Sequence, residues 1–136
     1  MNALVNTMNN FRVGTAMSVN TMPVETEADK KRILNGMNNA TAALKERVNV
    51  PFKMVGFYSE NSDKLNEETG ELESFKSTVI FADNGECYGT SSESVLRCLA
   101  RIISVFEGRN LFEEPLEVVV KSAKAKNGDV LLLELV

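Results

Sequence analysis

Residues 74–82 constrain the fold of this chain most strongly, because their side chains alternate between the two faces of an extended segment. One face carries Phe75, Val79 and Phe81. The other face carries Lys76, Thr78 and Ile80. Asp83-Asn84-Gly85 follows directly, and Asn and Gly tolerate the positive φ angles of tight turns. The pattern predicts a strand over 74–82 that turns back into a short strand over 86–89.

A helix is predicted immediately afterwards. Residues 90–93, Thr-Ser-Ser-Glu, match a capping box, in which a hydroxyl and a carboxylate cap the first backbone N–H groups. Apolar side chains then recur at helical spacing, from Val95 through Leu99 to Phe106. Gly108 is placed to end the helix.

The remaining segments predict further strands. We expect them over 32–38, 51–59, 116–121 and 130–136, with a short strand around 11–19 and a loop or helical turn around 40–47. An OB barrel has this order of elements: two strands, a third strand that turns back into a short one, a helix, and two more strands. The expected fold is therefore a mainly β, OB-fold barrel with one helix between the third and fourth strands.

The chain length favours one domain. A chain of 136 residues suits a single OB-type domain over residues 1–136, in which residues 1–24 form either a flexible or an edge-strand extension. No apolar run approaches the roughly 18 residues of a membrane span, and the N-terminus lacks a secretory pattern. We therefore expect a cytoplasmic protein with no membrane partner.

The charge is unevenly distributed. The chain carries −4 overall. Residues 60–73 contain six acids and only Lys64 as a base, so this segment carries −5 and the remainder +1. We expect the stretch 61–70 to be a solvated acidic loop. Binding to phosphates depends on the local patch, so the net charge does not exclude a nucleic-acid partner.

The residue types in this sequence give little support to an enzymatic function. The sequence has no histidine, which removes the usual general base and the commonest metal ligand. Cys87 and Cys98 lack CxxC spacing, and Cys98 lies in an apolar stretch typical of a small buried side chain. No nucleophile elbow, phosphate loop or zinc-ligand set occurs. We expect no enzymatic activity, no cofactor and no metal.

A binding platform is predicted on the central strands and on two loops. Aromatic rings stack on bases of any sequence, and nearby cations follow the backbone. The candidates on the strands are Lys53, Phe57, Tyr58, Phe75, Lys76 and Tyr88. Lys121, Lys124 and Lys126 cluster between the last two strands, and Lys45 and Arg47 lie in the connection after the first strand, on the other side of the expected groove.

The run Val79-Ile-Phe-Ala-Asp-Asn-Gly-Glu-Cys-Tyr88 resembles the single-stranded DNA-binding proteins of Bacillus podophages that replicate by protein priming. The motifs 32–37, 56–59, 117–121, 122–128 and 130–136 resemble further segments of that family in the same order, so the resemblance covers residues 31–136. It implies an OB-type fold and binding to the displaced strand without sequence preference, with Tyr58 and Tyr88 stacking on bases. The family's tyrosine in the loop after the second strand has no counterpart in 62–65.

The main hypothesis is therefore a non-sequence-specific single-stranded DNA-binding protein of phage or mobile-element DNA replication, with replication proteins as further partners. The alternative is a protein-binding OB module whose acidic segment 60–73 docks a basic replication or conjugation partner. A weaker third hypothesis is a metal-dependent nuclease that uses Asp83 or Glu86. The sequence does not distinguish a monomer from a homo-oligomer.

Overall fold

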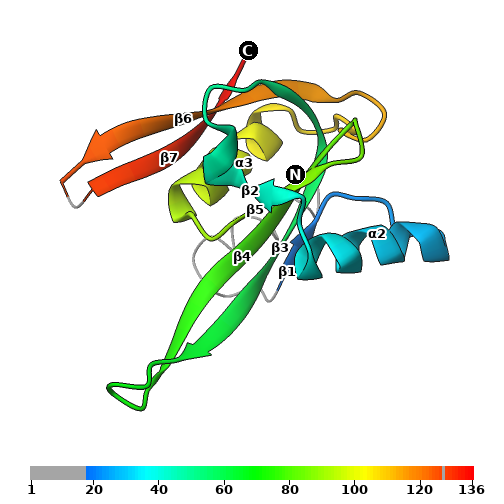
Figure 1. The fold of residues 1–136 in the computed structure, drawn as a ribbon. Helices are drawn as coiled ribbons and strands as arrows, with labels where there is room; N and C mark the ends of the chain where they lie inside the picture. Colours follow the sequence, from blue (N-terminus) through cyan, green and yellow to red (C-terminus); the bar gives the residue numbers. More distant parts are fainter. Residues whose placement is uncertain (1–17, 127) are drawn as a thin grey trace.

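The computed structural model describes residues 18–126 and 128–136. It contains two α-helices, one short 3-10 helix and seven strands (Figure 1). In chain order these are β1 (Ser18–Asn20), α2 (Glu27–Asn38), β2 (Ala42–Ala43), η1 (Leu44–Arg47), β3 (Phe52–Leu65), β4 (Leu72–Ala82), β5 (Cys87–Thr90), α3 (Glu93–Val105), β6 (Leu116–Ala125) and β7 (Gly128–Leu135). The fold is mainly β, as expected.

The strands form one curled sheet in the order β2-β5-β4-β3-β6-β7, and β1 pairs with β3 beside this path. Among the described strands, β2 and β5 pair in parallel and the other pairs are antiparallel. The curl brings the chain after η1 against β6, where Val48 forms a bridge with Val120. The Asn49 N–H also donates to the Val120 carbonyl at 2.8 Å. The result is a half-barrel whose two sides meet at this seam.

The main core lies between the curled sheet and α3. Phe57 and Ile80, which face each other across β3 and β4, pack with Val95 and Leu99 of α3, and all four are completely buried. The helix is capped by the Ser92 hydroxyl, which accepts the Val95 N–H at 3.2 Å. The predicted helix is confirmed, although Ser92 is its cap instead of the predicted Thr90.

A second, smaller core lies under α2 on the opposite face of β3 and β4. Ile33 of this helix packs there with Met22, Val79 and Phe81. This helix overturns the strand predicted over 32–38 and adds a second helix to the one expected. Its start is a capping box, because the Thr26 hydroxyl accepts the Asp29 N–H while the Asp29 carboxylate accepts the Thr26 N–H.

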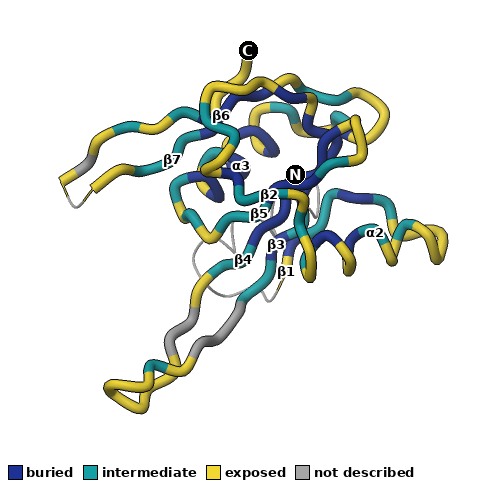
Figure 2. Tube along the Cα trace, in the orientation of Figure 1, coloured by how far each residue is buried: buried dark blue, intermediate teal, exposed yellow. Residues whose placement is uncertain are grey.

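Two hairpins project from the body of the protein as separate arms (Figure 1). One is the outer part of β3 and β4, which pair as far as Leu65 and Leu72. The loop predicted over 61–70 therefore begins too early, because β3 continues to Leu65 and the turn occupies only 66–71. Leu65 and Leu72, the last pair before the turn, are both exposed. Figure 2 shows that the tip of this arm is exposed.

The second arm is the predicted C-terminal hairpin of β6 and β7, and it is confirmed. Its strands extend further than expected, so that Lys124 pairs with Asp129 and the turn lies beyond Ala125. Near the N-terminus, β1 begins at Ser18, so most of the strand predicted around 11–19 and most of the extension 1–24 lie outside the described residues. Cys98 is half-buried on α3, where its sulfur accepts the Leu133 N–H at 3.5 Å.

The substitution Gly36→Ala tests the packing of α2. A Cβ atom at this position would lie 2.9 Å from the Phe81 ring, which is itself buried. Alanine favours a helix over glycine by about 1 kcal/mol, whereas overpacking costs about 1–3 kcal/mol. We expect Gly36→Ala to lower the free energy of unfolding measured by urea denaturation. The exposed neighbour Asn35→Ala serves as the control and should leave stability equal or higher; a Gly36→Ala protein of raised stability contradicts close packing.

Candidate functional site

Tyr88 of β5 is buried on the face of the sheet that packs against the main core. Only 3% of its surface is exposed, and its ring contacts the Phe52 ring edge-on at a centroid distance of 4.9 Å. The Arg47 guanidinium lies 5.3 Å from the ring centroid. The phenol donates a hydrogen bond of 2.6 Å to Glu86. In this structure the ring therefore presents no open face on which a base can stack.

Tyr58 of β3 has a different environment. It is half-buried beside the second core, and its phenol donates a hydrogen bond of 3.0 Å to Glu60. It pairs across the sheet with Val79 on one side and with Asn20 of β1 on the other. Tyr58 is thus only partly covered and lines a hollow at the surface, as a stacking residue requires.

Both tyrosines hold their protons more tightly than usual. Burial raises the pKa of Tyr58, and the hydrogen bond to Glu60 raises it further. Burial likewise raises the pKa of Tyr88, with a second contribution from the Glu86 carboxylate. Each phenol therefore stays neutral and acts as a hydrogen-bond donor at any physiological pH.

The predicted strand platform does not form one surface. Alternation along β3 and β4 puts Phe57 and Lys76 on the face of the main core, with Tyr88, whereas Tyr58 and Phe75 lie on the opposite face. Phe57 is completely buried, so its ring is not accessible to a ligand in this structure. Lys76 lies beside α3, where its ammonium contacts the Asn61 side chain.

The remaining predicted cations occupy other parts of the sheet. Lys53 is exposed on β3 opposite Glu117. Lys121 donates a hydrogen bond of 3.2 Å to the Asn49 side chain. Lys124 is exposed on the β6–β7 arm, and Lys126 is exposed in its turn. The arms thus differ in charge, because the described tip of the β3–β4 arm carries exposed glutamates.

The seam between η1 and β6 does bring two predicted segments together. The hydrogen bond between Lys121 and Asn49 joins β6 to the chain that follows Arg47. The basic groups predicted for the two sides of a groove, Lys45 and Arg47 on one and Lys121 on the other, therefore lie on neighbouring segments. Arg47 approaches Tyr88 from this seam.

The sequence interpretation missed a hollow beside Tyr58, because it did not predict α2. This hollow has a volume of about 320 Å³ and lies between α2 and the start of the β3–β4 pair. Its lining includes Lys30, Leu34, Met37 and Tyr58. The signal was present in the sequence, since Thr26-Glu-Ala-Asp29 is itself a capping-box pattern.

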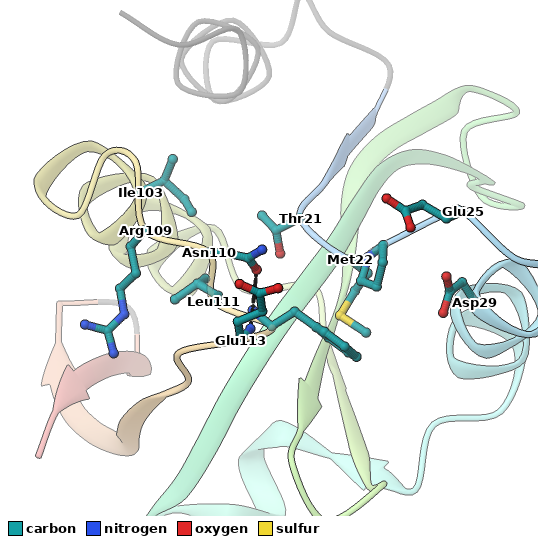
Figure 3. Close-up of a pocket in the computed structure, with 11 residues that line it drawn as sticks. Thr21, Met22, Glu25, Asp29, Ile103, Arg109, Asn110, Leu111 and Glu113 are labelled. Carbon is teal, nitrogen blue, oxygen red and sulfur yellow. Dashed lines mark hydrogen bonds between the residues drawn. The ribbon is translucent and has the colours of Figure 1, made fainter.

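A larger hollow of about 530 Å³ lies between the segment before α2 and the loop after α3 (Figure 3). The carboxylates of Glu25, Asp29 and Glu113 line it. Arg109 also lines it, but its guanidinium donates hydrogen bonds of 2.8 and 3.0 Å to the carbonyls of Glu114 and Pro115. Three carboxylates disfavour a phosphate ligand here.

Among the described residues, no group of three or more His, Cys, Asp or Glu side chains is positioned to hold a metal ion. Of the two carboxylates considered for a nuclease, Asp83 is exposed in the turn and Glu86 accepts the Tyr88 hydroxyl. None of the helices in the described ranges is long and apolar enough to cross a membrane.

Comparison with known proteins gives a family match over most of the chain. The family model described as phage single-stranded DNA-binding protein matches residues 13–135. The single-stranded DNA-binding protein of Bacillus phage GA-1 is 29% identical over 124 residues, which cover 89% of this chain and 72% of the phage protein. No solved structure gives a significant match. The resemblance seen in the motifs is confirmed, and the family match starts upstream of residue 31, so it includes α2.

The raised tyrosine pKa values predict how stability depends on pH. In the unfolded chain both phenols ionise near pH 10, whereas in the folded protein they ionise at higher pH. The stabilisation is therefore complete below pH about 10 and is lost as the pH rises above it. Absorbance titration near 295 nm, paired with urea denaturation across the same range, checks this; two tyrosines that ionise near pH 10 in the folded protein contradict it.

Proposed function

The chain belongs to the phage single-stranded DNA-binding protein family, and on that premise we propose that it binds single-stranded DNA without sequence preference during replication of a phage or mobile-element genome. The observation that carries this proposal is the family match over residues 13–135. We place the activity in the cytoplasm of a bacterial host cell, with single-stranded DNA as the principal partner and replication proteins as further ones.

The curled sheet supports an OB-type assignment within this proposal. Its two sides meet where Val48 bridges Val120, and α3, which follows β5 and precedes β6 in the chain, covers the main core. OB barrels bind oligonucleotides on their central strands and on the loops beside them. The seam between η1 and β6 corresponds to a position of this kind, and it carries Lys45, Arg47 and Lys121.

Base stacking is assigned in the proposal first to Tyr58, because this residue is only partly covered and lines a hollow at the surface. Phe75 lies on the same face of the sheet and is 38% exposed, so it offers a second ring farther along the β3–β4 arm. Tyr88 takes part only after Arg47 moves off its ring, since the guanidinium occupies the position a base needs. Phe57 is left out because it is completely buried.

Phosphate contacts are assigned to the predicted lysines, of which Lys53, Lys124 and Lys126 are exposed and Lys76 and Lys121 are half-buried. Lys53, Lys121, Lys124 and Lys126 lie on β3 and on the β6–β7 hairpin, while Lys76 lies beside α3. The glutamates at the described tip of the β3–β4 arm repel phosphates there, whereas the outer part of the β6–β7 hairpin carries Lys121, Lys124 and Lys126 against Asp129. Because each neutralised phosphate releases counterions, the affinity should fall steeply with salt.

The direct test is a fluorescence-anisotropy titration of labelled oligo-dT at several salt concentrations without divalent metal. Tight binding that weakens with salt, shows little preference among unrelated single strands and is poor for duplex supports the proposal. Absence of binding even at low salt overturns it.

Tyr58→Ala should weaken oligo-dT binding in the same titration, because each stacked base contributes about 1–3 kcal/mol. Tyr58→Phe keeps the ring and should bind nearly as tightly as the wild type. Urea denaturation of both variants controls for folding, since a half-buried side chain contributes less to the core than a buried one. Equal affinity of the wild type and Tyr58→Ala rules out stacking at this position.

The double substitution Lys124→Ala/Lys126→Ala should flatten the salt dependence. For single strands each lost phosphate contact reduces the slope of log K against log salt by about 0.7, so the expected change is about 1.4 for the pair. Lys31→Ala is the matched control, because Lys31 is an exposed lysine paired with Glu27 on α2 at 3.4 Å. A slope unchanged from the wild type would remove the β6–β7 arm from the DNA path.

A further inference from the structure

The hollow beside Tyr58 is bordered by unusually exposed apolar side chains. Leu34 of α2 is 62% exposed and Val24 is 49% exposed, although both lie next to the well-packed second core. Met37 and Tyr58 continue the apolar lining below them. Exposed apolar side chains that gather around a concavity mark a ligand or partner site more often than a plain surface.

The size of the hollow suits a small occupant. Its volume of about 320 Å³ is at the lower end of the roughly 300–1,000 Å³ typical of small-molecule pockets. Its apolar lining comes from two elements, with Tyr58 on β3 and Leu34 and Met37 on α2. An aromatic group placed in the hollow would therefore meet apolar atoms of both the sheet and the helix.

The polar groups around the hollow complement one nucleotide. The amide of Asn20 is already engaged, since it donates to the Met22 carbonyl and accepts the Met22 N–H at 2.9 Å each. The Glu60 carboxylate accepts the Tyr58 hydroxyl. Lys30 supplies a cation at the rim for a phosphate, and the exposed Asn38 supplies an amide that can meet the edge of a base.

We propose that this hollow is a pocket for one unpaired nucleobase of the bound strand, held between Tyr58 and the Leu34–Met37 face of α2. The proposal rests on the proposed single-stranded DNA binding and deepens it. A base inside a duplex is stacked and paired, so it cannot enter a pocket between a helix and a sheet unless it first leaves the double helix. The pocket thereby gives the protein a physical reason to prefer single strands.

The composition of the chain allows a specific optical test. The sequence contains no tryptophan and only two tyrosines. In a Tyr88→Phe protein, which keeps an aromatic ring against Phe52, Tyr58 is the only tyrosine fluorophore. Oligo-dT should quench its emission. An oligonucleotide of the same length made of abasic sites has the phosphates but no bases, and it should not quench the emission.

Leu34→Ala removes part of the helix wall while leaving the charge unchanged. We expect about a tenfold loss of affinity for oligo-dT and no change for the abasic strand. Val105→Ala is the matched control, because Val105 is a 77% exposed apolar residue on the other helix, α3. It should leave both affinities unchanged, and circular dichroism with urea denaturation should show all three proteins equally folded.

Two negative results have different meanings. Oligo-dT that binds Leu34→Ala as tightly as the wild type overturns the pocket, whether or not Tyr58 emission changes, while the proposed function stands. Oligo-dT that fails to bind even the wild type at low salt overturns the proposed function, and the pocket with it.

Discussion

Antiparallel pairing of β3 with β4 is the interaction on which the rest of the structure depends, because both faces of the inner part of this pair are buried. The register joins Phe57 to Ile80 and Tyr58 to Val79, so neighbouring positions point into opposite cores. The curled sheet and α3 enclose one core, and α2 covers the other. A slip of one residue would put the side chains of one core on the face of the other, where they do not match the helix that packs there.

The same alternation divides the candidate ligand-binding residues between two regions. Tyr88, covered by Arg47, belongs to the side of the main core and to the seam between η1 and β6. Tyr58 belongs to the side of α2. A bound strand that uses both tyrosines must therefore pass around the curled sheet instead of crossing one flat platform. The proposed phosphate contacts lie on the outer part of the β6–β7 hairpin, where Lys121, Lys124 and Lys126 face a single acid, Asp129.

Local signals explain which elements could be predicted from the sequence. The strand over 74–82, its tight turn, the helix from Val95 and the C-terminal hairpin all depend on patterns within a few residues, and they were predicted correctly. The strand expected over 32–38 was wrong, because the apolar content of a short run does not distinguish a strand from a helix. The capping box at Thr26 and the four-residue spacing of Ile33 and Met37 both indicate a helix here.

The sequence by itself determined the family, through co-linear motifs, and the alternation that makes the protein mainly β. It also supplied the two tyrosines and the cluster of lysines as candidates for binding. Only the tertiary structure decided which of them are accessible, since the burial of Phe57, the cover of Arg47 over Tyr88 and the hollow beside Tyr58 arise where segments distant in sequence pack together. Exposure is a property of these long-range contacts, and no local pattern of residues encodes it.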